Sequence, residues 1–263
     1  MFTNKDLRNL IVPLFIEQFL LMFVGIADTF VVSFSSEADV SGVSLVTSFN
    51  TVLIFLFTAL SSGGAVIIIQ SAINSLGTVV MAASSAAFNI EIITYDILNS
   101  FSQACTTFVG QNFGAGQVDR CKKTLALCLI EGLIALAAAL ALILPFGKQL
   151  LAIFNSDPEV VNTGYIRLVM VMLAHSFSLL FEVMSGYLRG FGVSMTPAVL
   201  TMAGVCGIRI AWIQFVFPAS RTFRTIMTVY PVSLAATAVL IFGALVICRP
   251  ARKFAAVQRE GTI

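Results

Sequence analysis

Long apolar runs dominate the chain, and short polar stretches separate them. An apolar run of about 20 residues is long enough to cross a bilayer as an α-helix. The pattern predicts an all-α fold, a polytopic bundle of about seven transmembrane helices. The predicted spans cover residues 10–32, 43–69, 79–109, 124–146, 165–188, 198–217 and 226–248.

Several of the predicted boundaries carry local signals of their own. Residues 155–159 read Asn-Ser-Asp-Pro-Glu, and a capping side chain followed by proline and an acid is typical of a helix start. Glycine and proline stop helices elsewhere, because glycine favours turns and proline lacks the backbone N–H. The remaining predicted breaks are a turn at residues 74–77, Pro145 with Gly147 closing the fourth span, and Gly190, Gly192 and Pro197 before the sixth.

Composition supports a membrane protein. Of the 263 residues, 58% are hydrophobic and 11% are charged, whereas roughly 25% are charged in a soluble domain. The mean hydropathy is +0.98. We therefore predict a multi-pass protein of the plasma membrane, surrounded by lipid. A net charge of +2 is too small to indicate a nucleic-acid partner, and the five cysteines form no C-x-x-C pair, which argues against a disulfide framework or a metal site.

Basic residues at the ends of spans predict which loops stay in the cytoplasm. The N-terminus, the loop after the third span and the basic tail at residues 249–263 all favour the cytoplasmic side. Seven spans cannot satisfy all three, so one span is missing or one segment is re-entrant between Ser62 and Gly77. The basic residues concerned are Lys5, Arg8, Arg120, Lys122, Lys123, Arg249, Arg252, Lys253 and Arg259.

Acidic residues inside the predicted spans are the main candidates for chemistry. A carboxylate at the bilayer centre costs about 2.5–3.5 kcal/mol, so it needs a partner, a water-filled cavity or a proton. We predict that Asp28, Glu91 and Glu182 bind a proton or Na⁺. The alternatives are an interfacial position for Asp28 and a buried structural hydrogen bond for Glu91. The other acids in spans are Glu17, Asp96 and Glu131.

Further polar residues could shape a cavity. We predict that Asn50, Asn89 and Tyr230 line a substrate cavity, and that Asn89 could share a coordination site with Glu91. His175 is a core residue or a proton relay. With one histidine and no nucleophile paired to it, the chain is not predicted to be an enzyme. It also lacks a phosphate-binding G-x-x-x-x-G-K-[ST] motif, so no nucleotide is expected.

Several short stretches, taken in order, resemble the bacterial form of the multidrug and toxic compound extrusion (MATE) family. Residues 109–116 read Val-Gly-Gln-Asn-Phe-Gly-Ala-Gly, and residues 186–192 read Gly-Tyr-Leu-Arg-Gly-Phe-Gly. The resemblance covers nearly the whole chain. The other stretches that carry it are Pro13 with residues 28–29, residues 59–65, Pro197, residues 207–209 with Trp212, and residues 230–233.

The resemblance implies a two-lobe fold of twelve helices, of which this chain holds part. Residues 1–70 resemble the first two helices of the N-lobe, and residues 71–248 resemble the end of the seventh helix and helices eight to twelve. Residues 249–263 form the basic tail. Helices three to six and most of seven have no counterpart. This gap falls between Ser62 and Gly77, where the basic loops also disagree with the number of predicted spans.

The resemblance further implies an antiporter that exports cationic or amphipathic organic compounds in exchange for Na⁺ or H⁺, without another cofactor. Asp28 matches the family's cation-site aspartate in the first helix, while Glu91 and Glu182 match acid-bearing positions of helices eight and ten. Two alternatives stay open. One is a lipid or polysaccharide flippase of the wider superfamily, and the other is a non-transporting membrane subunit or a decayed gene product.

Overall fold

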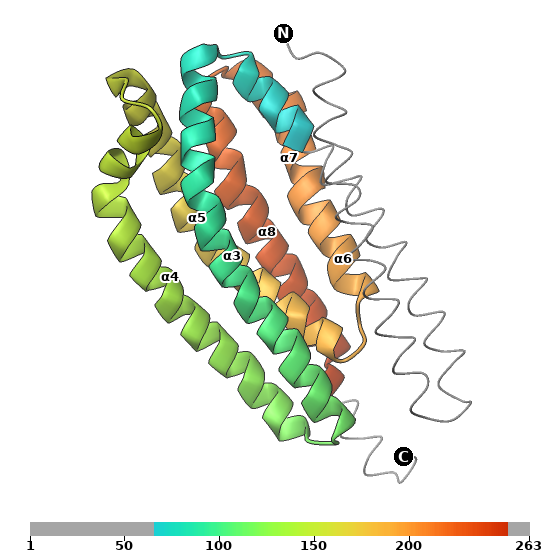
Figure 1. Cartoon of the computed structure of the whole chain (residues 1–263). Helices are drawn as coiled ribbons and strands as arrows, with labels where there is room; N and C mark the ends of the chain where they lie inside the picture. Colours follow the sequence, from blue (N-terminus) through green and yellow to red (C-terminus); the bar gives the residue numbers. More distant parts are fainter. Residues whose placement is uncertain (1–65, 252–263) are drawn as a thin grey trace, which may run out of the picture. The chain divides into compact units, whose positions relative to one another are not determined.

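In the computed structural model of the protein, residues 66–251 are described, and all of their regular elements are helical (Figure 1). Residues 66–74 form a helix that leads into the turn before α3. The first predicted span and nearly all of the second lie outside the described residues. The long helices are α3 (Thr78–Gly114), α4 (Val118–Phe154), α5 (Pro158–Gly190) and α8 (Phe223–Cys248), with α6 (Met195–Thr201) and α7 (Ile208–Ala211) between the last two.

Five helical segments of the described part are long and apolar enough to cross a membrane, and they coincide with the last five predicted spans. The fourth of them, Met195–Ala219, joins α6 and α7 through π-helical turns at Met202–Gly207 and Trp212–Val216. Large apolar side chains remain exposed along the outer helix faces, as expected of surfaces that face lipid. Examples are Ile134, Leu142, Ile153, Val239 and Ile247.

The prediction that Pro145 and Gly147 close the fourth span was wrong. α4 continues through both residues to Phe154. A proline removes one helix hydrogen bond, and transmembrane helices tolerate it because neighbouring groups satisfy the freed carbonyl. Gly147 provides room for α5 instead, because a Cβ there would lie 2.9 Å from side-chain atoms of Tyr165 and Leu168.

The other breaks are found where the sequence predicts them. Gly77 and Gly192 adopt φ angles of +102° and +79°, a backbone region that glycine enters without a steric penalty. Asp157 caps α5, since its Oδ1 accepts a hydrogen bond of 2.9 Å from the backbone N–H of Glu159. Pro158 occupies the first helical position, where its missing N–H has no cost.

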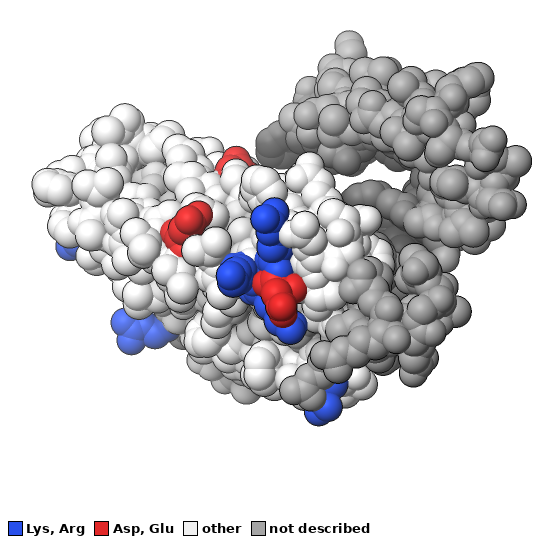
Figure 2. Space-filling model, turned by 90° about the horizontal axis from the view of Figure 1, so that it is seen from below, with Lys and Arg blue, Asp and Glu red and all other residues white. Residues whose placement is uncertain are grey.

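Successive spans run in opposite directions, and the Met195–Ala219 span lies between α5 and α8, so α3, α5 and α8 point the same way (Figure 1). The turn before α4, the turn after α5 and the end of α8 therefore meet at one end of the bundle. The view of that end shows basic side chains gathered around an acidic one (Figure 2). Asp119 and Lys122 form an exposed ion pair there at 3.0 Å. The basic residues of the sequence predict the same side of the membrane for the Arg120–Lys123 segment, at the start of α4, and for Arg249. The placement of both at one end of the bundle agrees with this prediction.

Helix α5 lies at the centre of the bundle, where it packs against α3, α4 and α8. Small residues allow α3 and α5 to approach closely, which is the usual way that helices pack in membranes. A Cβ added at Gly186 would lie 2.5 Å from the backbone oxygen of Ser102, and one at Gly190 would lie 2.7 Å from Val109. The α3–α5 contact therefore depends on glycine at both positions.

Gly186→Ala is expected to destabilise the protein by about 1–3 kcal/mol, the usual cost of forcing an extra carbon into a packed interior. The contact is with the backbone of Ser102, which cannot move aside as a side chain can. Gly243→Ala on α8 is the matched control, because nothing lies within 4 Å of its added Cβ. Thermal melting of the purified chain in detergent checks this, and equal melting temperatures for the two variants would contradict it.

Candidate functional site

A row of polar side chains lies between α3 and α5, which we call the α3–α5 seam. Its members on α3 recur at intervals of three, four or seven residues, and this spacing places them on one helix face. Most of them are buried although both helices are long and apolar. The seam consists of Ser84, Glu91, Thr94, Tyr95 and Ser102 on α3 and Arg167, His175, Ser178, Glu182 and Ser185 on α5.

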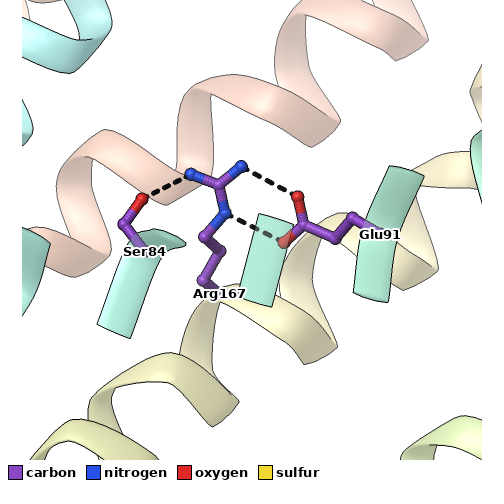
Figure 3. A network of polar contacts seen from close by, with 3 residues as sticks. All are labelled: Ser84, Glu91 and Arg167. Carbon is purple, nitrogen blue, oxygen red and sulfur yellow. Dashed lines mark hydrogen bonds and ion pairs between the residues drawn. The ribbon is translucent and has the colours of Figure 1, made fainter. Parts of the chain in front are cut away.

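The most buried charges of the seam form an ion pair. Arg167 donates from Nε to Glu91 Oε1 at 2.9 Å and from Nη2 to Glu91 Oε2 at 2.8 Å (Figure 3). Its third nitrogen, Nη1, donates to Ser84 Oγ at 2.6 Å. Both charged residues are 4% exposed. The two carboxylate oxygens are thus both occupied, and the pair fixes α3 against α5.

Helix α8 contributes an aromatic ring beside this pair. The Arg167 guanidinium carbon lies 5.5 Å from the ring centroid of Tyr230, and that of Arg209 on α7 lies 4.5 Å from the same ring. Arg209 Nε also donates to Ser233 Oγ at 3.2 Å. A tyrosine face attracts cations through its quadrupole, so Tyr230 connects two arginines from different helices.

Glu182 has a different environment from Glu91. The Tyr95 hydroxyl donates to Glu182 Oε1 at 3.3 Å, and within the described residues no arginine or lysine forms an ion pair with this carboxylate. Arg189 reaches Ser102 Oγ at 2.9 Å, and Ser102 in turn donates to the backbone oxygen of Glu182 at 2.7 Å. Glu182 is half-buried among the described residues, whereas Glu91 is buried.

His175 lies on α5 between Arg167, which binds Glu91, and Glu182. It is buried, and neither ring nitrogen has a hydrogen-bond partner within the part of the chain that the structure describes. The Tyr95 ring is the neighbouring aromatic group, with its centroid 6.3 Å away. Thr94 Oγ1 and Ser185 Oγ are likewise buried and unpaired among the described residues. A buried polar group without a hydrogen bond is costly. The α3–α5 seam thus contains three side chains, Thr94, His175 and Ser185, that could still form hydrogen bonds.

The structure brings some predicted site residues together and separates others. Glu91 and Tyr230 meet through Arg167. Asn89 is exposed on α3 and makes no hydrogen bond to Glu91 in the described structure. Asp28 and Asn50 lie outside the described residues. Among residues 66–251, no group of three or more His, Cys, Asp or Glu side chains could hold a metal ion.

Sequence reasoning missed Arg167. The predicted fifth span begins at residue 165, which makes an arginine at 167 resemble an ordinary interfacial charge. α5 in fact begins at Pro158, so Arg167 lies more than two turns inside the helix. A signal was present, because the proline cap at residues 157–159 already marks the true start. Counting turns from that cap would have placed Arg167 in the interior.

Comparison with known proteins identifies the family. A family model described as MatE matches residues 67–213, which is more than half of the chain. A probable multidrug resistance protein NorM of Chromobacterium violaceum is 26% identical over 128 residues, covering 49% of this chain and 28% of the relative. Multidrug and toxin extrusion protein 1 of Mus musculus is 31% identical over 129 residues, covering 49% and 23%. The matched region is thus less than a third of either relative's length.

Solved structures show the same fold at low sequence identity. The crystal structure of a MATE in the bent conformation has a TM-score of 0.71 at 15% identity, covering 87% of this chain and 49% of that one. A MOP superfamily transporter from Pyrococcus furiosus has a TM-score of 0.65 at 16% identity, covering 75% and 44%. The chain thus spans about half of these structures. It is a multi-pass membrane protein that belongs to the MATE family of transporters.

Proposed function

We propose that the chain acts as an ion-coupled exporter of organic compounds, with Glu182 as the acid that takes up and releases the coupling ion. The observation that carries this proposal is a carboxylate inside a membrane span with no ion-pair partner among the described residues. A carboxylate in such a place needs a partner, a water-filled cavity or a proton, and this makes Glu182 a candidate to bind a proton or Na⁺. The names of the relatives, which refer to multidrug resistance and extrusion, support the export of organic compounds.

Glu91 is the weaker of the two described acids for this role. Its two oxygens already accept from Arg167, so a proton or Na⁺ would have to displace a buried guanidinium. Glu182 offers one oxygen to a tyrosine hydroxyl, which a bound proton or ion need not displace. Asp28 stays a predicted cation site, and Asn50, Asn89 and Tyr230 stay predicted cavity residues. The substrates proposed from the family are cationic or amphipathic organic compounds, and the coupling ion is Na⁺ or H⁺.

A second candidate function takes account of the part of the fold that the matched region covers. Alternating access needs two helix bundles that move against each other, and the chain covers 49% of a solved MATE chain. A non-transporting membrane subunit is therefore the alternative to a transporter.

Transport by the purified full chain in lipid vesicles separates the two. Ethidium supplies the organic cation, and DNA trapped inside the vesicles reports its entry by fluorescence. An imposed Na⁺ or pH gradient is expected to drive ethidium across the membrane faster than in vesicles without protein. Ethidium movement that no ion gradient alters would contradict the exporter and favour the subunit.

A further inference from the structure

Arg209 places a positive charge near the middle of the Met195–Ala219 span. Its guanidinium carbon lies 4.5 Å from the Tyr230 ring centroid, and its Nε donates to Ser233 Oγ. No carboxylate within residues 66–251 forms an ion pair with it. An arginine inside a membrane span is costly and normally marks a functional site with a partner.

The charges around Tyr230 do not cancel. The positive charge of Arg167 is matched by Glu91 through two hydrogen bonds. Arg209 adds a second positive charge next to the same ring, and the described carboxylates supply no second negative charge within ion-pair distance. Within residues 66–251 the cluster therefore carries one positive charge that no ion pair compensates. Arg209 is half-buried among the described residues.

The chemistry of the cluster suits an anionic group. Guanidinium presents a planar fork of N–H donors that matches a carboxylate or sulfonate with two parallel hydrogen bonds. Ser233 Oγ accepts from Nε of this fork, and the Tyr230 ring lies against the guanidinium, so the two Nη nitrogens of Arg209 keep no hydrogen-bond partner among the described residues. We propose that Arg209, held in place by Tyr230 and Ser233, binds the carboxylate or sulfonate group of an organic anion or zwitterion through its two Nη nitrogens. This goes beyond the proposed export of cationic compounds and does not depend on it.

The chain contains its own reporter for this site. Trp212 is the only tryptophan, and it lies three residues after Arg209, one helical turn away on the same face. Its indole N–H donates to the backbone oxygen of Thr225 at 2.9 Å. A nitrophenyl compound that binds at Arg209 should therefore quench the fluorescence of Trp212.

Three probes that share the nitrophenyl quencher and differ in charge test the proposal on the purified full chain in detergent. They are 4-nitrobenzoate, neutral 4-nitrobenzyl alcohol and cationic 4-nitrobenzylammonium. Saturable quenching is expected with 4-nitrobenzoate, at a concentration at least tenfold lower than with either other probe. N-acetyltryptophanamide in the same micelles corrects for partitioning of the probes. Equal quenching by all three probes, or no saturation with 4-nitrobenzoate, would overturn the proposal and indicate that Arg209 is neutralised within the chain itself.

Variants assign the binding to Arg209. Arg209→Gln is expected to weaken 4-nitrobenzoate binding at least tenfold, and Arg209→Lys, which keeps the charge but loses the fork, at least threefold. Arg224→Gln is the matched control, since it removes an exposed arginine next to Thr225 and should leave binding unchanged. If Arg209→Gln does not fold, Arg209→Lys and Ser233→Ala decide, and unchanged binding in both refutes the site. Failure here leaves ion-driven ethidium transport untouched, so the two proposals fail separately.

Discussion

Glu91→Leu is expected to destabilise the protein by about 3–5 kcal/mol, because it leaves the Arg167 guanidinium buried without its counter-charge. Arg167 is 4% exposed, so water cannot replace the lost carboxylate. Ser84 Oγ would remain as a hydrogen-bond acceptor for the guanidinium, but it carries no negative charge. The purified chain in detergent should therefore melt at a clearly lower temperature than the unaltered protein.

The double variant Glu91→Leu with Arg167→Leu makes this result specific to the pair. Replacing a buried ion pair by apolar side chains is often neutral or stabilising, because it removes two desolvation costs together. Most of the lost stability should therefore return. Glu131→Leu on an exposed face of α4 serves as the control for removal of an acid and should change little. If the double variant is as unstable as the two single losses added together, the pair does not act as a unit.

Glu182→Gln is expected to reduce ion-driven ethidium transport at least tenfold while the melting temperature changes by only a few degrees. Glutamine has the shape of glutamate, and its carbonyl oxygen can still accept from the Tyr95 hydroxyl. The glutamine side chain cannot take up and release a proton as a carboxylate does, and it has no negative charge to bind Na⁺. Loss of function without loss of fold is therefore the expected signature of a coupling acid.

Two comparisons complete the Glu182 experiment. Glu131→Gln removes another acid of an apolar span and should transport normally, because this side chain is exposed on α4. Transport that continues unchanged in Glu182→Gln would exclude Glu182 as the coupling acid. Asp28, predicted from its place in the first span, would then become the leading candidate.

Much of the helix layout could be predicted from the sequence, because membrane spans depend on local properties. Apolar length locates each span without knowledge of its neighbours. The cap at Asp157 and the turns at Gly77 and Gly192 also act over a few residues, and all three are found in the structure. Pro145 misled the prediction because its effect on α4 depends on what surrounds the freed carbonyl and not on the proline alone.

The partners inside the site could not be predicted in the same way. Glu91 and Arg167 are 76 residues apart in the chain, and only the packing of α3 against α5 brings them together. Apolar periodicity shows that an acid lies in a span, but it does not show whether a cation faces it. The difference between Glu91, which forms an ion pair, and Glu182, which has no ion-pair partner among residues 66–251, therefore became visible only in the structure. Likewise, the Arg209 contact with Tyr230 depends on how α7 meets α8.

Infrared difference spectroscopy of the protein in lipid, recorded while the pH is changed in steps, measures directly whether Glu91 or Glu182 takes up a proton. A protonated carboxyl group has its own C=O stretching band, so each acid that takes up a proton contributes to the difference spectrum. We expect Glu182→Gln to remove a component of this band that the double variant Glu91→Leu with Arg167→Leu retains, and Na⁺ to suppress the same component if it competes for the site. A band that is complete in Glu182→Gln and reduced in the double variant would show that Glu91, and not Glu182, exchanges the proton.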